Sequence, residues 1–410
     1  MPSGEAYYRG FEQGPIRPPS EARSLLIRVT RNCPWNRCHF CPVYKGTDFS
    51  RRPLAHVLAD IEAVAAWMET FAPDAVRRGG TGGTGRPDEL PPGAGAPEGA
   101  FFSQDAAVSS APTPAPPGPP LDPGAEMAAW NWYRAGMKSV FLQDANPMAV
   151  PPAEMIAILS LLKERFPGIE RITTYARSRT VARIDAEDLA RMRAAGLDRV
   201  HIGFESGSDE VLSFMDKGVT KAMQIEGGRK IKGNGMELSA YYMPGLGGHR
   251  LWRENALETA DLMNQVDPDF IRLRTLAIPD HLALAEDVAQ GKFQKASDLE
   301  NAQEILLFLQ SLEGITSRVV SDHILNLFED VGGKLPEDRD AMTEEIEAFL
   351  ALDPVEQVIY RVGRRAGLFR GLSDLADPRT HERAARVVRE LNVTPRNVDE
   401  VTDDMVKRFI

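Results

Sequence analysis

The stretch that decides the fold reads Ser24-Leu25-Leu26-Ile27-Arg28-Val29-Thr30-Arg31-Asn32-Cys33-Pro34-Trp35-Asn36-Arg37-Cys38-His39-Phe40-Cys41. It begins as a β-type apolar run and passes directly into a loop that holds all three cysteines of the chain. Three thiolates on one short loop can occupy three corners of a metal centre and leave the fourth corner open. The loop therefore predicts a reactive metal site rather than a closed structural one.

The rest of the composition is that of a large soluble protein. The chain has 410 residues, of which 43% are hydrophobic and 26% charged, enough for one large or two medium domains. No uninterrupted apolar run has the length of a membrane span or an export signal, and no cysteine remains for a disulfide framework, so we expect a cytoplasmic location. The formal net charge of −11 argues against nucleic acid or an anionic membrane as the main partner.

Residues 73–124 interrupt the pattern with 12 prolines and 10 glycines. This stretch has too little apolar surface to offset the entropy of ordering it, so we predict a disordered surface insertion.

Outside the insertion, short β-type runs alternate with helical stretches, which is typical of βα units around a parallel sheet. The predicted strands are Ser24–Thr30, Ser139–Asp144, Glu170–Tyr175, Arg199–Phe204, Glu237–Met243 and Asp269–Ile278. The predicted crossover helices are Leu54–Phe71, Pro152–Phe166, Ala186–Ala195, Thr220–Lys232 and Trp252–Val266. Six such strands predict an α/β fold with a partial (β/α)6 TIM-like barrel over residues 1–290.

Beyond Gly291 the pattern becomes helical, and we expect no strands there. Residues 291–410 are predicted to form a helical carboxy-terminal extension with helices at Leu299–Leu312, around His323–Phe328, and at Asp338–Ala351, Val355–Ala366 and His381–Leu391.

Two metals compete for the three thiolates. A structural zinc needs a fourth ligand, for which His39, His201, His249 and His323 are the candidates. An iron-sulfur cluster with one open iron needs no further ligand and is favoured. Three reduced cysteines without a metal are the third alternative.

Further segments extend the pattern of the cysteine loop. Phe40 precedes Cys41, and the spacing is Cys-x4-Cys-x2-Cys. With Ile202–Leu212, Tyr242–Gly248 and Arg272–Leu276 in this order, residues 20–290 resemble the Elongator/MiaB/HemN-like branch of the radical SAM superfamily, and in particular its single-cluster Fe-S oxidoreductases. The usual superfamily spacing is one residue shorter, Cys-x3-Cys-x2-Cys.

This resemblance implies an enzyme that binds a 4Fe-4S cluster at Cys33, Cys38 and Cys41 and S-adenosylmethionine at its free iron. Reductive cleavage would give a 5′-deoxyadenosyl radical that takes hydrogen from a small-molecule substrate. A reductant of the flavodoxin or ferredoxin kind is implied as a partner. The residues placed at cofactor-binding positions by the resemblance are Phe40, Asp144, Asn146, Arg177, Ser178, Glu205, Gly245 and Gly247. For the two glycines, a plain strand-to-helix turn remains an alternative.

Strand alternation gives an independent view of the barrel interior. On the fourth strand it turns Val200, Ile202 and Phe204 outward. The inward side chains would form a polar chamber suited to a carboxylate- or phosphate-bearing substrate, with four candidate catalytic residues, Tyr175, His201, Arg272 and Arg274. The alternative is an internal ion network, in which Glu205 or a neighbouring acid pairs with these arginines.

Two further inferences concern residues outside the chamber. Asp322 and His323 are candidates to act on the substrate from the barrel mouth, or else a helix cap and a packed histidine. With all three cysteines used by one cluster, no cysteine-ligated auxiliary cluster is possible within this chain. The alternative to an enzyme is a binding or electron-transfer protein with a structural zinc or Fe-S site.

Overall fold

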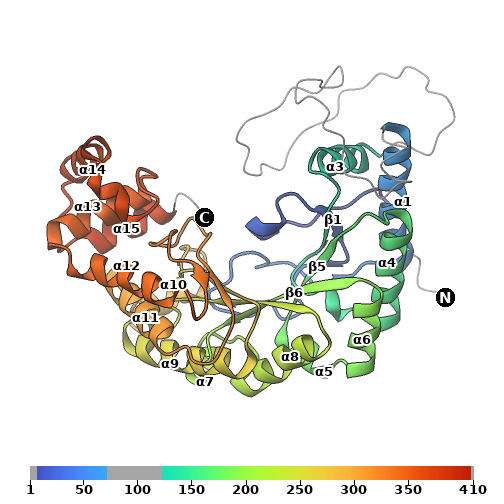
Figure 1. The fold of residues 1–410 in the computed structure, drawn as a ribbon, viewed down its shortest axis with the longest axis horizontal. Coiled ribbons are helices and arrows are strands. Elements are labelled where there is room, and N and C mark those ends of the chain that lie inside the picture. The colour runs from blue at the N-terminus through green and yellow to red at the C-terminus, as the bar shows by residue number, and fades with distance from the viewer. Residues whose placement is uncertain (1–6, 72–121, 408–410) are drawn as a thin grey trace.

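The computed structural model describes residues 7–71 and 122–407. Its main sheet begins with six parallel strands that are neighbours in chain order, β1 (Leu25–Arg28), β4 (Ser139–Gln143), β5 (Arg171–Ala176), β6 (Leu197–Glu205), β7 (Glu237–Tyr242) and β8 (Phe270–Leu273). Figure 1 shows the sheet curving inside an arc of helices. The predicted partial (β/α)6 barrel is confirmed, and the strand ends differ from the predicted ones by at most five residues.

The sheet continues beyond the sixth strand, against the expectation of no strands after Gly291. β9 (Arg318–Val320) pairs in parallel with β8, and β10 (Gly333–Lys334) pairs antiparallel with β9, which makes eight strands. That expectation was wrong because strands of three and two residues are too short to show a period in the sequence. The division between domains at residue 290 stays a prediction, although the sheet itself crosses it.

A second, two-stranded sheet flanks the cysteine loop. β2 (Thr30–Arg31) pairs antiparallel with β3 (Ser50–Arg51), so the loop leaves and rejoins the barrel at one place. The first predicted strand is thus divided between two sheets.

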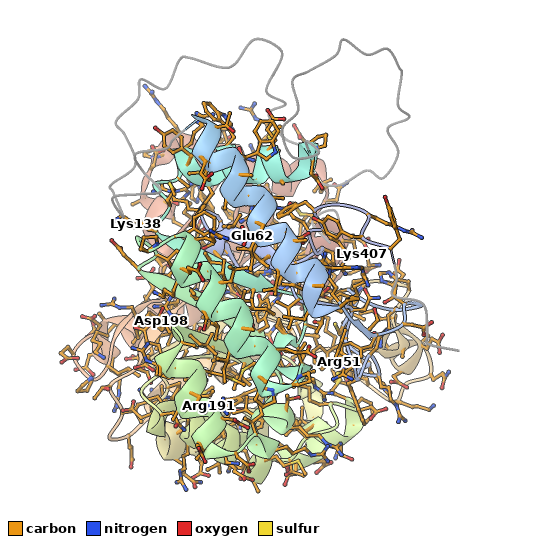
Figure 2. All side chains as sticks on the ribbon, turned by 90° about the vertical axis from the view of Figure 1, so that its right-hand side faces the viewer. Arg51, Glu62, Lys138, Arg191, Asp198 and Lys407 are labelled. Carbon is orange, nitrogen blue, oxygen red and sulfur yellow. The ribbon has the colours of Figure 1, made fainter. Side chains whose placement is uncertain are left out.

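An outer layer of helices covers the sheet. Helix α1 (Leu54–Phe71), which carries Glu62, runs beside α4 (Pro152–Arg165) (Figure 2). Glu62 forms an ion pair of 2.7 Å with Arg165 of α4. Ser208, Thr220 and Ser297 begin helices by accepting a hydrogen bond from a backbone N–H of the first turn. The helices up to residue 310 are α1 (Leu54–Phe71), α3 (Pro123–Arg134), α4 (Pro152–Arg165), α5 (Ser178–Arg183), α6 (Ala186–Ala194), α7 (Asp209–Phe214), α8 (Lys221–Gly233), α9 (Gly248–Val266), α10 (Ala283–Ala289) and α11 (Asp298–Gln310).

The predicted insertion lies mostly outside the described residues. Its last three residues do not belong to it, because Asp122 caps α3 by accepting hydrogen bonds from the backbone N–H groups of Gly124 and Ala125. The insertion therefore ends before Asp122.

The carboxy-terminal helices lie at one end of the arc in Figure 1 and are α12 (Arg339–Ala351), α13 (Pro354–Arg365), α14 (Pro378–Glu390) and α15 (Val398–Val406). The segment predicted to be helical around His323–Phe328 is instead an irregular connection between β9 and β10. Side chains from α13 bind its backbone carbonyl groups, which leaves these groups unavailable for helical hydrogen bonds.

The core lies between the strands and the helices. Val200, Ile202 and Phe204 of β6 are fully buried in it, as their alternation predicted, and each contributes about 2 kcal/mol of burial free energy. Within the described ranges, none of the helices combines the length and hydropathy that a membrane span requires.

Candidate functional site

The three cysteines line one cavity of about 240 Å³ at the carboxyl ends of the parallel strands. None of them forms a disulfide, and all three are partly accessible. Asn32 and Asn36 adopt left-handed backbone conformations (φ 66° and 46°) on either side of Cys33, which asparagine tolerates better than most residues. These two turns bend the loop around Cys33.

Polar contacts fix the loop between the cysteines. The Lys45 ammonium donates hydrogen bonds to the carbonyl groups of Cys38 (2.8 Å) and Asn36 (3.2 Å). The backbone N–H of Asn36 lies 3.4 Å from the Cys33 Sγ and donates to it. The loop is therefore preorganised by its own backbone and by one cation.

Burial and nearby cations shift the pKa values of the buried thiols in opposite directions. Burial raises the pKa of Cys38 and Cys41, while the Lys217 ammonium opposes this shift at both thiols and the Arg177 guanidinium also does so at Cys38. Thiols kept protonated by burial become thiolates when they bind a metal, because the metal charge outweighs the cost of burial. A metal centre at this place is thus compatible with the electrostatics.

Glu205 and Lys217 form an ion pair inside the cavity, with 3.1 Å between Lys217 Nζ and Glu205 Oε1. Lys217 also lies over the ring of Phe40, 5.6 Å from its centroid. Glu205 has φ 65° at the end of β6, and a Cβ atom at Gly203 would collide with its carboxylate. Only glycine at position 203 lets Glu205 fold back over the strand.

Arg177 and Ser178 follow β5 and line the same cavity. Arg177 donates a hydrogen bond to the Lys217 carbonyl (2.5 Å) and stacks on Trp35 at 5.1 Å. The hydroxyl of Ser178 is buried and has no hydrogen-bond partner among the described residues. A buried hydroxyl without a partner is costly, so a ligand that bonds to it would relieve that cost.

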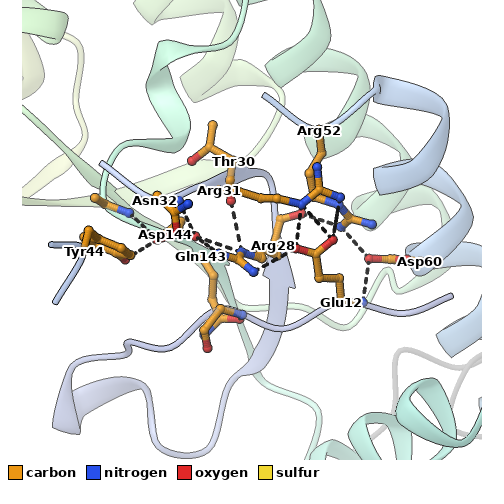
Figure 3. Close-up of polar contacts among 12 residues, drawn as sticks. Glu12, Arg28, Thr30, Arg31, Asn32, Tyr44, Arg52, Asp60, Gln143 and Asp144 are labelled. Carbon is orange, nitrogen blue, oxygen red and sulfur yellow. Dashed lines mark hydrogen bonds and ion pairs between the residues drawn. The ribbon is translucent and has the colours of Figure 1, made fainter. Parts of the chain in front are cut away.

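Asp144 and Asn146 lie behind the cavity wall. Figure 3 shows the Asp144 carboxylate beside Arg28 (2.7 Å), the Asn32 backbone N–H (3.1 Å) and the Tyr44 hydroxyl. Asn146 donates to Thr180 and accepts from the Arg177 backbone N–H. Tyr44 lines the cavity, so Asp144 affects the shape of the cavity indirectly, by holding Tyr44 and the start of the cysteine loop in place.

Tyr175 of β5 and Arg274, which follows β8, also line the cavity. The Arg274 guanidinium makes no hydrogen bond or ion pair with any residue of 7–71 or 122–407. The pKa of the neighbouring His323 is lowered mainly by burial and further by the positive charge of Arg274. A guanidinium that borders a cavity without an acid beside it is suited to bind an anion.

The other two candidate catalytic residues are not on the cavity surface. His201 is fully buried, and burial lowers its pKa, so the imidazole is neutral. It packs against the rings of Tyr175, Tyr241 and Phe141 below the cavity. Arg272 is buried, pairs with Asp322 at 2.8 Å and donates to the Ser239 hydroxyl, which matches the ion network considered for it above.

Gly245 and Gly247 form the turn after β7 but do not line the cavity. A Cβ atom at either would meet neighbouring atoms, Asn301 Oδ1 at 2.7 Å and the Leu251 carbonyl at 2.6 Å. Their positions are explained by the close approach of α9 and α11. The Gly245 N–H donates to Glu304 (3.0 Å), a fully buried carboxyl of α11.

Several lining residues were missed at the sequence level, above all Lys217, Tyr241, Tyr44 and Leu325. Alternation on β7 would have found Tyr241, because Leu238, Ala240 and Tyr242 face the core.

The ligand set argues against a single metal ion. Among the described residues, no group of three His, Cys, Asp or Glu side chains is close enough to hold one ion. Neither His39 nor His201 lines the cavity of the cysteines, and His201 is fully buried. In a 4Fe-4S cluster each thiolate binds a different iron, so the ligands stand farther apart than around one zinc. The residues present fit the cluster better.

The match to a known family agrees with this site. The model of the Radical SAM superfamily matches residues 110–260, from the end of the insertion through most of α9, and leaves out the cysteine loop. The predicted resemblance to this superfamily is confirmed. Its members are enzymes that use a 4Fe-4S cluster and S-adenosylmethionine, the two cofactors predicted here.

The solved structures that match the chain are distant in sequence. Elp3 of the archaeon Methanocaldococcus infernus is 17% identical (45% of this chain, 48% of Elp3, TM-score 0.36), and coproporphyrinogen III oxidase HemN of Escherichia coli is 16% identical (70% and 52%, TM-score 0.42). Methylornithine synthase PylB is 15% identical (79% and 81%, TM-score 0.40). The chain spans about half the length of Elp3 and HemN. No curated protein matches the chain.

Proposed function

We propose that this protein is a radical SAM enzyme that cleaves S-adenosylmethionine at one 4Fe-4S cluster and removes a hydrogen atom from a small anionic substrate. The observation that carries the proposal is that Cys33, Cys38 and Cys41 line one cavity with Lys217, Glu205 and Arg274. The Arg274 guanidinium has no hydrogen-bond or ion-pair partner among the described residues.

The three thiolates would hold the cluster and leave one iron for S-adenosylmethionine. When bound, this pair supplies a one-electron cleavage of the C5′–S bond, which yields methionine and a 5′-deoxyadenosyl radical that takes the substrate hydrogen. The electron would come from a reductant of the flavodoxin or ferredoxin kind. The cytoplasmic location also remains a prediction, resting on the use of all three cysteines at this site.

The residues beside the cysteines have the chemistry to hold the charged groups of S-adenosylmethionine. The Glu205 carboxylate can accept hydrogen bonds from the amino group, and the free Ser178 hydroxyl and the Arg177 guanidinium can donate to the carboxylate. Asp144 and Asn146 would act indirectly, by fixing Tyr44 and the Arg177 backbone.

Charge pairing inside the cavity supports an anionic substrate. Lys217 is paired with Glu205, and Arg177 lies beside the thiols, so both cations have partners at the cofactor end. Arg274 has none among the described residues and is placed beside Tyr175 and Tyr241. Its side chain is exposed, and a carboxylate or phosphate bound in the cavity would pair with it.

The test is reconstitution of the protein without oxygen, followed by reduction and addition of S-adenosylmethionine. We expect about four irons per chain and formation of 5′-deoxyadenosine and methionine in equal amounts. A variant with all three cysteines replaced by alanine should do neither, whereas Arg274→Gln should still cleave S-adenosylmethionine in the absence of substrate. Stoichiometric zinc in anaerobically purified protein, or a full cluster without cleavage under several reductants, would refute the proposal.

A further inference from the structure

The connection between β9 and β10 reaches the cavity from the carboxy-terminal region. Leu325, in the middle of this connection, is buried and lines the cavity together with Arg274 and Thr275. Its neighbour Ile324 is 60% exposed and does not line the cavity. The connection therefore contributes one apolar side chain to the cavity wall.

The barrel holds this connection through Asn326. The Asn326 side chain accepts a hydrogen bond from the Thr275 backbone N–H (2.9 Å) and donates one to the Leu273 carbonyl (2.8 Å). These two residues flank Arg274 in the chain. Leu325 and the backbone at Arg274 are therefore fixed relative to one another.

Helix α13 holds the same connection from its other side. Arg365 donates to the Leu325 carbonyl (2.7 Å), and Arg364 donates to the carbonyls of Asn326 (3.0 Å) and Leu327 (2.9 Å). Both arginines are less than 10% exposed, and Arg365 is also paired with Asp298 at 3.1 Å. Burying two guanidinium groups is costly unless their donors are used, and here three consecutive carbonyls use them.

We propose that the β9–β10 connection is the substrate-selecting wall of the cavity, in which Leu325 sets the length of an anionic substrate whose charged group binds Arg274. This inference rests on the function proposed above. Leu325 lines the same cavity as Arg274, so its side chain takes up space that a substrate held by its charge at Arg274 would otherwise fill. His323, buried enough to lower its pKa to about 4, stays neutral and does not compete with Arg274 for the anion.

The test uses straight-chain carboxylates from acetate to octanoate as probes, with binding to the reconstituted holoprotein measured by calorimetry. We expect an optimum chain length for the wild type. Leu325→Ala should favour acids about two carbons longer by about tenfold, because it opens space for additional methylenes. Leu325→Trp should move the optimum to shorter acids, and Ile324→Ala, the matched control, should leave it unchanged.

Arg274→Gln should weaken every acid at least tenfold and should leave the binding of the corresponding alcohols unaltered. An unchanged length profile in both Leu325 variants would overturn the proposal, as would the absence of carboxylate binding to the wild type.

Arg365 is a positioning residue in this scheme. Arg365→Met should flatten the length profile, because the Leu325 carbonyl loses its donor, and Arg365→Lys should restore part of the selectivity. If the Arg365→Lys variant had normal iron content but no more selectivity than Arg365→Met, Arg365 would not be a positioning residue.

Cleavage of S-adenosylmethionine measured in the same preparations separates the two proposals. Normal cleavage of S-adenosylmethionine, with an unchanged length profile in the Leu325 variants, would refute only the proposal that Leu325 selects the substrate. A shifted profile in protein that binds a cluster but never cleaves S-adenosylmethionine would refute the proposed function and leave the wall standing.

Discussion

Glu304 makes the stability of this protein depend on pH near neutrality. Its carboxyl is fully buried in α11, where it accepts hydrogen bonds from the Tyr242 hydroxyl (2.6 Å), the Asn255 amide (2.7 Å) and the Gly245 N–H (3.0 Å). Burial raises its pKa from 4.5 to about 7, and these donors only partly oppose the shift. A raised pKa means that the folded state binds the proton more tightly than the unfolded state. The resulting stability is complete below pH 4.5 and is lost as the pH rises through 7.

The magnitude follows from the two pKa values. Between pH 5 and pH 8, Glu304 should lower the free energy of unfolding by about 2.5 kcal/mol. We propose urea unfolding of wild type and Glu304→Gln across this range, in protein kept anaerobic. Other titrating groups contribute to both proteins and cancel in the difference, so Glu304→Gln should gain about 2.5 kcal/mol relative to wild type on going from pH 5 to pH 8. The exposed Glu347→Gln is the control and should show no such gain. Parallel pH profiles for wild type and Glu304→Gln would refute this reasoning.

Three further changes test the loop and its supports. Cys38→Ala should reduce iron to background after reconstitution, measured by iron analysis and visible absorption, and retention of a full 4Fe-4S spectrum would contradict the ligand assignment. Gly218→Ala should cost about 1 to 2 kcal/mol, because Gly218 has φ 70° and an added Cβ would meet the Trp35 ring; unchanged thermal unfolding and tryptophan fluorescence would count against that contact. Asp144→Ala should cost about 3 kcal/mol, because it leaves the largely buried Arg28 without its shorter ion pair, and an unaltered unfolding midpoint would show that Glu12 alone satisfies Arg28.

The barrel could be predicted from sequence because its strands are long enough to show their character. Hydrophobic core residues recur at every second position of β6 (200, 202 and 204) and of β7 (238, 240 and 242), and α1 begins and ends where its apolar spacing does. β9 and β10 could not be found in this way, because three residues and two residues carry no period. Their pairing depends on the neighbouring strand β8, which is a tertiary contact.

The cysteine loop was predictable because its chemistry is concentrated in nine residues. The roles of the residues behind the loop were not predictable. Asp144 and Asn146 follow a strand end, as a ligand-binding residue would, but the left-handed backbone at Asp144 (φ 106°) turns its carboxylate toward Arg28 and Tyr44. Arg272 and Arg274 look equivalent in the sequence. They differ in the structure because Asp322, fifty residues later, reaches only Arg272.

The arginines of α13 hold the β9–β10 connection through hydrogen bonds to its backbone. Arg364 and Arg365 bind the carbonyl groups of residues 325–327, and every amino acid has such a carbonyl. Replacement of Leu325 therefore leaves the fastening of the segment intact. Mutations accumulated over evolution, or introduced by an engineer, can reshape this part of the cavity without a compensating change in the helix that supports it.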